Sequence, residues 1–198
     1  MKILTDATTP FGRKTVVCAL ERKLSFTEIF VTIDASLDSN NPLRQIPVLE
    51  TADGQCLYDS DMVVLYLNDL CGDQALIPNA DKFATLTRMA LANGLMEAVL
   101  LRTMESRRPD GERSQTFIDK LSERALRAIQ SLNTQASQLN TDVLNAADIG
   151  AACAVEYADF RFSTSWRDAA PELNHWHAAI AERPSFVATR PTRTQALS

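Results

Sequence analysis

The strand and helix patterns of this chain change at one place, and that change limits the folds open to it. Up to Asp59, short β-branched and aromatic runs alternate with helical segments, whereas beyond Lys82 only helical spacing remains. The segment between them, CGDQALIPNADK at 71–82, contains Gly, Pro and Asn, which interrupt regular structure. We therefore predict two domains, at 1–77 and 82–198, the first mixed α/β and the second all helical.

The first domain begins with a strand, a helix and a second strand. The strand at Lys2 to Thr5 leads into a helix whose apolar face is formed by Val16, Val17, Ala19 and Leu20. Pro10 suits the first helical turn, where its missing N–H costs nothing, and Thr9 is then the natural N-cap. The run SFTEIFVTI at 25–33 is rich in β-branched and aromatic residues and predicts the second strand.

A hairpin and a further helix complete the first domain. IPVLET at 46–51 and QCLYD at 55–59 read as two strands joined by the tight turn of Asp53 and Gly54. Ser60 is a capping residue ahead of DMVVLYLNDLC, whose apolar residues recur at helical spacing. The order β-α-β, then β-β-α, predicts a mixed sheet with helices.

The second domain contains helical segments only. They cover 84–108, 117–139, 145–162 and 172–186. Pro109 marks the end of the first segment, and Pro184 is expected to stop the last. In the third segment, Asn145 as N-cap and Asp148 three residues later predict a variant of the reciprocal capping arrangement.

Composition argues against several classes of function. The 198 residues carry a net charge of −5, which does not favour nucleic-acid binding. The four cysteines form no CxxC pair, and with only two histidines the spacings supply no local ligand set for a metal. The opening MKILTDATTPFG has too short an apolar run for a secretory signal or a membrane span, so we expect a cytosolic protein with no membrane partner.

Five motifs follow one another along the chain at characteristic distances. They are TTPFGRK at 8–14, NPLRQIPVL at 41–49, YDSDMVVLYL at 58–67, NAADI at 145–149 and ERPSF at 182–186. In this order they resemble the soluble glutathione S-transferases, especially the small bacterial members, over nearly the full length. The resemblance implies a thioredoxin-like N-terminal domain followed by an all-α C-terminal domain. It also implies a cytoplasmic homodimer that acts in detoxification, conjugating the thiolate of glutathione, its co-substrate, to a small hydrophobic electrophile.

The turn before the first helix lacks a thiol. In thioredoxin-like redox proteins the corresponding turn resembles Cys-Pro-aromatic-Cys, and its first thiol attacks a disulfide. Thr9 and Gly12 stand at the two cysteine positions here, so this turn cannot carry out disulfide exchange. Many glutathione transferases use a Ser or Tyr hydroxyl at this place to hold bound glutathione as its thiolate. By that resemblance Thr9 is the catalytic residue.

One hydroxyl at a helix start is energetically sufficient for this role. Lowering a thiol pKa from ~8.5 by about two units requires roughly 2.7 kcal/mol of preference for the anion. A hydrogen bond to a charged acceptor contributes about 1.5–3 kcal/mol, and a helix N-terminus about 0.3–1 kcal/mol more. The alternative is that Thr9 only caps the helix, in which case Thr8 is the reserve donor.

The resemblance also implies how the peptide backbone of glutathione is bound. The proline after Ile46 is typically cis in thioredoxin-like folds, and Ile46 should pair with the cysteinyl backbone in the manner of an edge strand. At the next helix start, Ser60 and backbone N–H groups accept the α-carboxylate, while Asp59 meets the α-ammonium. Gln45, beside Arg44, stands where family members often carry a Lys for the glycyl carboxylate.

An apolar pocket between the domains is expected to receive the electrophile, with Phe11, Leu100 and Met104 as its candidate residues. The alternative function is a glutathione-binding or ligand-binding protein with a stress-regulatory role and little transferase activity, because Thr stands at the activating position.

The remaining polar features are interpreted as structural. NAADI supports folding, and His175 and His177 are packing or surface residues. The arginines near the end of the first long helix are interpreted as part of a solvated helix face, with the alternative that they face the open substrate side of the cleft; they are Arg102, Arg107 and Arg108.

Overall fold

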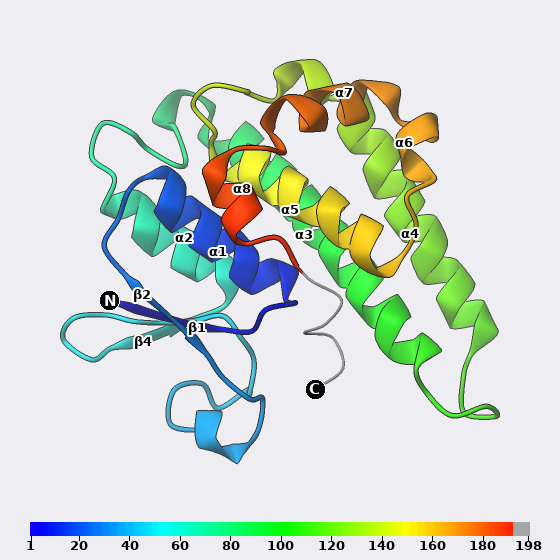
Figure 1. The fold of residues 1–198 in the computed structure, drawn as a ribbon, viewed down its shortest axis with the longest axis horizontal. Helices are drawn as coiled ribbons and strands as arrows, with labels where there is room; N and C mark the ends of the chain where they lie inside the picture. The colour runs from blue at the N-terminus through cyan, green and yellow to red at the C-terminus, as the bar shows by residue number, and fades with distance from the viewer. Residues whose placement is uncertain (192–198) are drawn as a thin grey trace.

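The computed structural model describes residues 1–191 (Figure 1). Its strands are β1 (Lys2–Thr5), β2 (Thr27–Phe30), β3 (Val48–Glu50) and β4 (Cys56–Tyr58). Its α-helices are α1 (Pro10–Glu21), α2 (Ser60–Asp69), α3 (Lys82–Ser106), α4 (Gln115–Thr134), α5 (Ala146–Arg161), α6 (Trp166–Ala169), α7 (Pro171–Ile180) and α8 (Pro184–Ala188). Short 3-10 turns lie at η1 (Ala35–Leu37), η2 (Asn79–Asp81) and η3 (Ala136–Gln138). In this part of the chain no strand follows β4, which confirms the predicted change to helical structure.

The strands form one mixed sheet in the order β2-β1-β3-β4. β1 runs parallel to β2 and antiparallel to β3, and β3 pairs with β4 as a hairpin. Gly54, with φ of 87°, lies in the hairpin turn, where a residue with a side chain would be strained. The predicted order β-α-β, then β-β-α, and the mixed α/β N-terminal domain are confirmed.

Alternate residues of the central strands point to opposite faces of the sheet. Ile3 and Leu49 belong to the main core, together with apolar residues of α1 and α2. Leu4 and Val48 form a smaller cluster on the other face with Leu37 of η1. In Figure 1, α1 and α2 accordingly lie on one side of the sheet and the segment that carries η1 lies on the other. The loops at the end of β1 and before β3 are thereby held at one end of the sheet.

Helix α1 buries three of the four residues predicted for its apolar face, Val16, Val17 and Ala19, and it also buries two charged side chains. Lys14 is fully buried and Arg13 is 7% exposed, whereas Leu20, placed on the apolar face by the sequence, is 37% exposed. The prediction for Leu20 is wrong because α1 lies between the sheet and α5, so its buried surface is set by two neighbours rather than by one apolar stripe.

The charge of Arg13 is compensated inside the protein. Its Nη2 lies 2.5 Å from Oε2 of Glu156 on α5, and Nε2 of His177 lies 2.9 Å from Oε1 of the same carboxylate. Burial alone would raise the pKa of Glu156, but the hydrogen bond with His177 and the charge of Arg13 outweigh it and lower that pKa. His177 is therefore a buried packing residue that also joins α7 to α5.

The helical half confirms the predicted cap of α5. The Asn145 side chain accepts hydrogen bonds from the amides of Ala147 and Asp148, and the Asp148 carboxylate accepts the amide of Asn145 at 2.8 Å. Asp148 is fully buried, so this reciprocal arrangement satisfies the helix start inside the core. The structural role expected for NAADI is consistent with these contacts.

The last predicted helix is divided in two. α7 ends at Ile180, and Pro184 is the first residue of α8, so the prediction of one helix running to Pro184 was wrong. Proline suits the first turn of a helix because its missing N–H would be unpaired there. The main core includes residues of both halves of the chain, and the domain limits at 77 and 82 stay predictions. No helix within residues 1–191 combines the length and hydrophobicity that crossing a bilayer takes.

Candidate active site

A cavity of about 770 Å³ lies where the end of the sheet meets α3 and α5. All the residues predicted for the site line it: Thr9, Phe11, Gln45, Ile46, Asp59, Ser60, Leu100 and Met104. They come from the turn after β1, the first turn of α1, the loop before β3, the start of α2 and one face of α3. The structure thus brings these segments together, while the role of each residue stays a prediction. Across the described residues, no group of three or more His, Cys, Asp or Glu side chains could hold a metal ion.

The turn after β1 is organised by a carboxylate. Oδ1 of Asp6 accepts the amides of Thr8 and Thr9 at 2.6 and 2.7 Å, and also the Thr8 hydroxyl at 3.1 Å. Thr9 occupies the N-cap position of α1, but its side chain makes no capping hydrogen bond. Among residues 1–191 the Thr9 hydroxyl has no hydrogen-bond partner. The hydroxyl that forms a hydrogen bond within the turn is that of Thr8.

Gly12 is required by close packing. A Cβ at this position would lie 1.8 Å from Oγ1 of Thr5 and 2.7 Å from Cγ2 of Thr9. The Thr9 methyl group therefore lies over Gly12, and the hydroxyl on the same carbon points in another direction. A cysteine at position 12 would clash with these atoms, so the fold leaves no room there for the second thiol that disulfide exchange requires.

The first turn of α1 offers amides to an anion. Pro10 has no N–H, and the first hydrogen bond into the helix is from the Arg13 amide to the Thr9 carbonyl at 3.1 Å. The amides of Phe11 and Gly12 donate to no acceptor in the described part of the chain. Unpaired amides at a helix start favour negative charge, and here they accompany the Thr9 hydroxyl.

The loop before β3 presents an unpaired backbone. The bond between Ile46 and Pro47 is cis, as the resemblance implies. Asn41 is 1% exposed, and its side chain donates to the Gln45 carbonyl at 2.7 Å, which holds the loop in place. The N–H and C=O of Ile46 make no hydrogen bond within residues 1–191, so both are open to an extended peptide. Arg44, next to Gln45, is already paired with a carboxylate, that of Asp38, at 2.5 Å.

At the start of α2, the cap is Asp59 rather than Ser60. Oδ1 of Asp59 accepts the amides of Asp61 and Met62 at 2.8 and 3.3 Å, and Ser60 is the first helical residue. The prediction that Ser60 caps this helix was therefore wrong. Asp59 has φ of 71°, a conformation that costs a residue other than glycine about 1–3 kcal/mol. Its second oxygen and the Ser60 hydroxyl have no hydrogen-bond partner in the described structure.

A buried lysine of α1 stabilises the start of α2. Lys14 is fully buried, and its Nζ lies 2.6 Å from Oδ1 of Asp61 on α2 and 2.8 Å from Oδ1 of Asn93 on α3. The Asn93 amide donates to both oxygens of Asp61 at 2.8 Å. Since these residues belong to α1, α2 and α3, the network fixes the start of α2 relative to both neighbouring helices. Sequence reasoning missed it, although the charged pair inside the apolar run of α1 is a visible signal.

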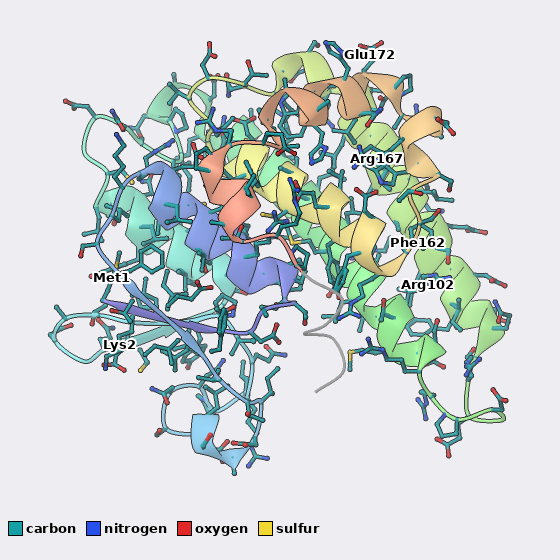
Figure 2. All side chains as sticks on the ribbon, in the orientation of Figure 1. Met1, Lys2, Arg102, Phe162, Arg167 and Glu172 are labelled. Carbon is teal, nitrogen blue, oxygen red and sulfur yellow. The ribbon has the colours of Figure 1, made fainter. Side chains whose placement is uncertain are left out.

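The arginines near the end of α3 do not behave alike. Arg102 donates to the Ser122 hydroxyl at 2.9 Å and lies over the Phe162 ring, 4.8 Å from its centroid (Figure 2). Arg108 is exposed and pairs with neighbouring glutamates. Arg107 is exposed as well, which agrees with the predicted solvated face, and it also lines the cavity, which agrees with the alternative that it faces the substrate side.

The fold, the cavity and the turn chemistry define a class of protein. Residues 8–70 match the family described as "Glutathione S-transferase, N-terminal domain". A relative covering 98% of this chain, and itself matched over its whole length, is 31% identical. The chain therefore belongs to the glutathione S-transferase family, which confirms the resemblance and the two-part fold that it implied.

That relative is the "Uncharacterized GST-like protein YibF" of Escherichia coli K12, matched over 201 residues. A solved glutathione S-transferase from Methylobacillus flagellatus, with glutathione bound, is 31% identical with a TM-score of 0.90, over 96% of this chain and 99% of its own. A glutathione transferase family member from Pseudomonas fluorescens, solved with S-(propanoic acid)-glutathione, is 30% identical with a TM-score of 0.88, over 97% and 100% of the two chains.

Proposed function

We propose that this protein is a glutathione transferase that joins the glutathione thiolate to a small hydrophobic electrophile. The observation that carries the proposal is the free Thr9 hydroxyl, which lines the same cavity as the unpaired backbone of Ile46. Similar structures hold glutathione or a glutathione conjugate, which supports the same ligand here. Transfer to an electrophile requires a thiolate, and the turn after β1 is where the chain offers groups to stabilise one.

Glutathione is expected to lie along the unpaired groups of the cavity. The Ile46 N–H and C=O would pair with its cysteinyl backbone, and the Gln45 side chain lies toward the glycyl end. The Ser60 hydroxyl would donate to the γ-glutamyl carboxylate at the start of α2. The free oxygen of Asp59 would accept the neighbouring ammonium group. Each of these assignments uses an atom that the described fold leaves without a partner.

The thiol is activated by a hydroxyl and two amides. A hydrogen bond from Thr9 to the thiolate is worth about 1.5–3 kcal/mol, and the helix start adds about 0.3–1 kcal/mol. Together these lower the pKa of the bound thiol by about one to three units. The electrophile then approaches across the apolar wall made by Phe11, Leu100 and Met104.

The test is a titration of glutathione bound to three variants, followed through the ultraviolet absorbance of the thiolate. Thr9→Val keeps the shape of the side chain and removes the hydroxyl, so the thiol pKa should rise by about one to two units. Thr9→Ser should keep the lowered value. Thr8→Val is the matched control, because its hydroxyl already donates to Asp6. If the bound thiol keeps the pKa of free glutathione in both wild type and Thr9→Val, the proposed activation is wrong.

A second function is favoured by the packing of Thr9. Its methyl group lies over Gly12, which restricts the hydroxyl to few directions. If none of them reaches the sulfur, the protein binds glutathione or another ligand without activating it and serves in stress regulation. The same titration separates the two functions, because tight binding with an unshifted thiol pKa belongs only to the second.

We further propose that the protein is a cytoplasmic homodimer, with α2 of one protomer facing the long helices of the other. Large apolar side chains are exposed on these elements: Met62 at 50% on α2 and Phe83 at 78% on α3. Sedimentation equilibrium should give twice the chain mass for the wild type. Phe83→Asp should shift the equilibrium towards the monomer, and a wild type that sediments as a monomer at micromolar concentration would contradict the proposal.

A further inference from the structure

Two of the arginines that line the cavity have no ion-pair partner in the described structure and no role in the proposed glutathione contacts. Arg107 is the C-cap of α3 and Arg161 is the last residue of α5, and both line the cavity wall. Tyr157, one turn before Arg161, is 5% exposed and lines the same wall. Burial raises the pKa of Tyr157, the positive charges of Arg161 and Arg107 act to lower it, and the negative charge of Asp6 acts to raise it.

Other charged groups of the cavity have partners within the fold. Arg44 and Arg124 pair with carboxylates, while the Asp6 and Asp59 carboxylates accept backbone amides, as shown by the pairs Arg44–Asp38, Arg124–Glu97, Asp6–Thr9 and Asp59–Asp61. Arg107 and Arg161 differ from these residues. Arg161 lies over the Phe160 ring, 4.0 Å from its centroid, but neither arginine has a carboxylate within 4.0 Å among residues 1–191. This wall of the cavity therefore holds two guanidinium groups without an ion-pair partner in the described part of the chain.

We infer that these two arginines bind an anionic group of the electrophile, so that the preferred second substrate carries a carboxylate or a similar anion. The inference rests on the proposed transferase function and narrows its substrate class. Leu100, Met104 and Arg107 follow one another at spacings of four and three residues on the cavity face of α3. Over about 10 Å of helix the wall therefore changes from apolar to cationic. An electrophile bound with its apolar body beside Leu100 would place an anionic end at Arg107.

Helix polarity offers a competing reason for these residues. Cations are favoured at helix C-termini, and each arginine stands at such an end. That effect explains each residue on its own helix. It does not explain why both line one cavity together with the buried Tyr157, while Arg108, also at the end of α3, pairs with glutamates and does not line the cavity. A guanidinium group binds carboxylates through paired N–H donors, which suits this wall to an anion.

The test compares two electrophiles that differ only in charge, 4-chloro-3,5-dinitrobenzoate and its primary amide. For each probe kcat/KM is divided by the uncatalysed rate with glutathione, which removes differences in intrinsic reactivity. The corrected ratio of benzoate to amide should be about 25-fold or more in wild type, as expected for charge-assisted hydrogen bonds. Arg107→Gln and Arg161→Gln should each lower the ratio by about fivefold or more, and the double variant should bring it close to one. Arg108→Gln removes the same charge outside the cavity and should change the ratio less than about twofold.

The affinities of the two S-aryl glutathione conjugates, measured by calorimetry, separate the two proposals. If neither probe is turned over but the benzoate conjugate still binds more tightly than the amide conjugate, and Arg107→Gln removes that difference, transferase activity fails and the anion site stands. If both probes react with a corrected ratio near one, or if Arg108→Gln lowers the ratio as much as Arg107→Gln does, the anion site is wrong although the transferase stands. If neither conjugate binds, both proposals fail.

Discussion

The ion pair between Lys14 and Asp61 should respond unequally to the loss of its two partners. The lysine side chain is 0% exposed and the aspartate side chain 30%. Asp61→Asn would leave an ammonium group inside the protein with only amide oxygens around it. Lys14→Met would leave a carboxylate that water reaches and that still accepts two hydrogen bonds from Asn93. The buried partner therefore depends on the exposed one more than the reverse.

The magnitudes follow from the burial of each partner. Breaking a buried pair so that one charge stays inside costs about 3–5 kcal/mol, and Asp61→Asn should fall near the lower end because an oxygen remains beside Lys14. Lys14→Met should cost about 1 kcal/mol, the value of a partly exposed ion pair. The double variant has no buried charge and should also lose about 1 kcal/mol. The coupling energy of the two substitutions is then about 3 kcal/mol.

Urea unfolding followed by tryptophan fluorescence measures these free energies of unfolding. Thermal melts should rank the variants in the same order of stability. For a chain of this size about 3 kcal/mol corresponds to a fall in Tm of roughly 6–12 °C, and about 1 kcal/mol to roughly 2–4 °C. The matched control is the pair of Lys2 and Glu50, which has the same separation of 2.6 Å but exposures of 49% and 27%. Its single variants should each lose less than about 1 kcal/mol. Equal losses for Asp61→Asn and Lys14→Met, adding within about 0.5 kcal/mol in the double variant, would refute the reasoning.

Three further outcomes are expected. Gly12→Ala should destabilise the protein by more than about 2 kcal/mol in urea unfolding, because its Cβ would lie 1.8 Å from a hydroxyl of β1, whereas Gly94→Ala, whose nearest atom is 3.7 Å away, should gain up to about 1 kcal/mol. The pKa of Glu156 is lowered from 4.5, so its stabilisation is present above that pH and lost below it. Glu156→Gln should therefore flatten the acid-side fall of the unfolding free energy in a pH series. Cys18 and Cys153 are fully buried with raised thiol pKa values, Cys153 to about 11, so alkylation followed by mass spectrometry should leave both unmodified in the native protein.

Much of the secondary structure could be predicted because its determinants are local. The β-branched runs, the turn at Gly54 and the cap at Asn145 each act within a few residues, and the structure confirms them. The prediction failed for Leu20, and the burial of Lys14 was not predicted at all, because the burial of α1 depends on α5, more than a hundred residues later. Periodicity shows which face of a helix is apolar, but it does not show that a second neighbour will bury a charged face beside its partners.

The residues of the candidate site could likewise be predicted only in part. Motif residues such as Ile46 and Ser60 could be placed by resemblance, since each lies at a fixed position beside a strand or helix start. For Arg107 the substrate side of the cleft was only an alternative, and its sharing of a cavity wall with Arg161 could not be predicted, because the two residues belong to different helices that are brought together by the packing of α3 on α5. One arginine at a helix end is ordinary. A shared cavity wall is a tertiary property that no spacing in the chain encodes.

The question of whether Thr9 caps α1 or faces a ligand shows where local reasoning stops. A Thr directly before a helix-starting proline has the composition of an N-cap, and the structure places it at that position. Asp6, however, accepts the Thr8 and Thr9 amides, and the Thr9 methyl group lies over Gly12. The hydroxyl and the first amides of α1 are thus left without partners in the described fold. A cap that bonds none of these amides leaves its hydroxyl free for a ligand, which is the arrangement that an anionic sulfur requires.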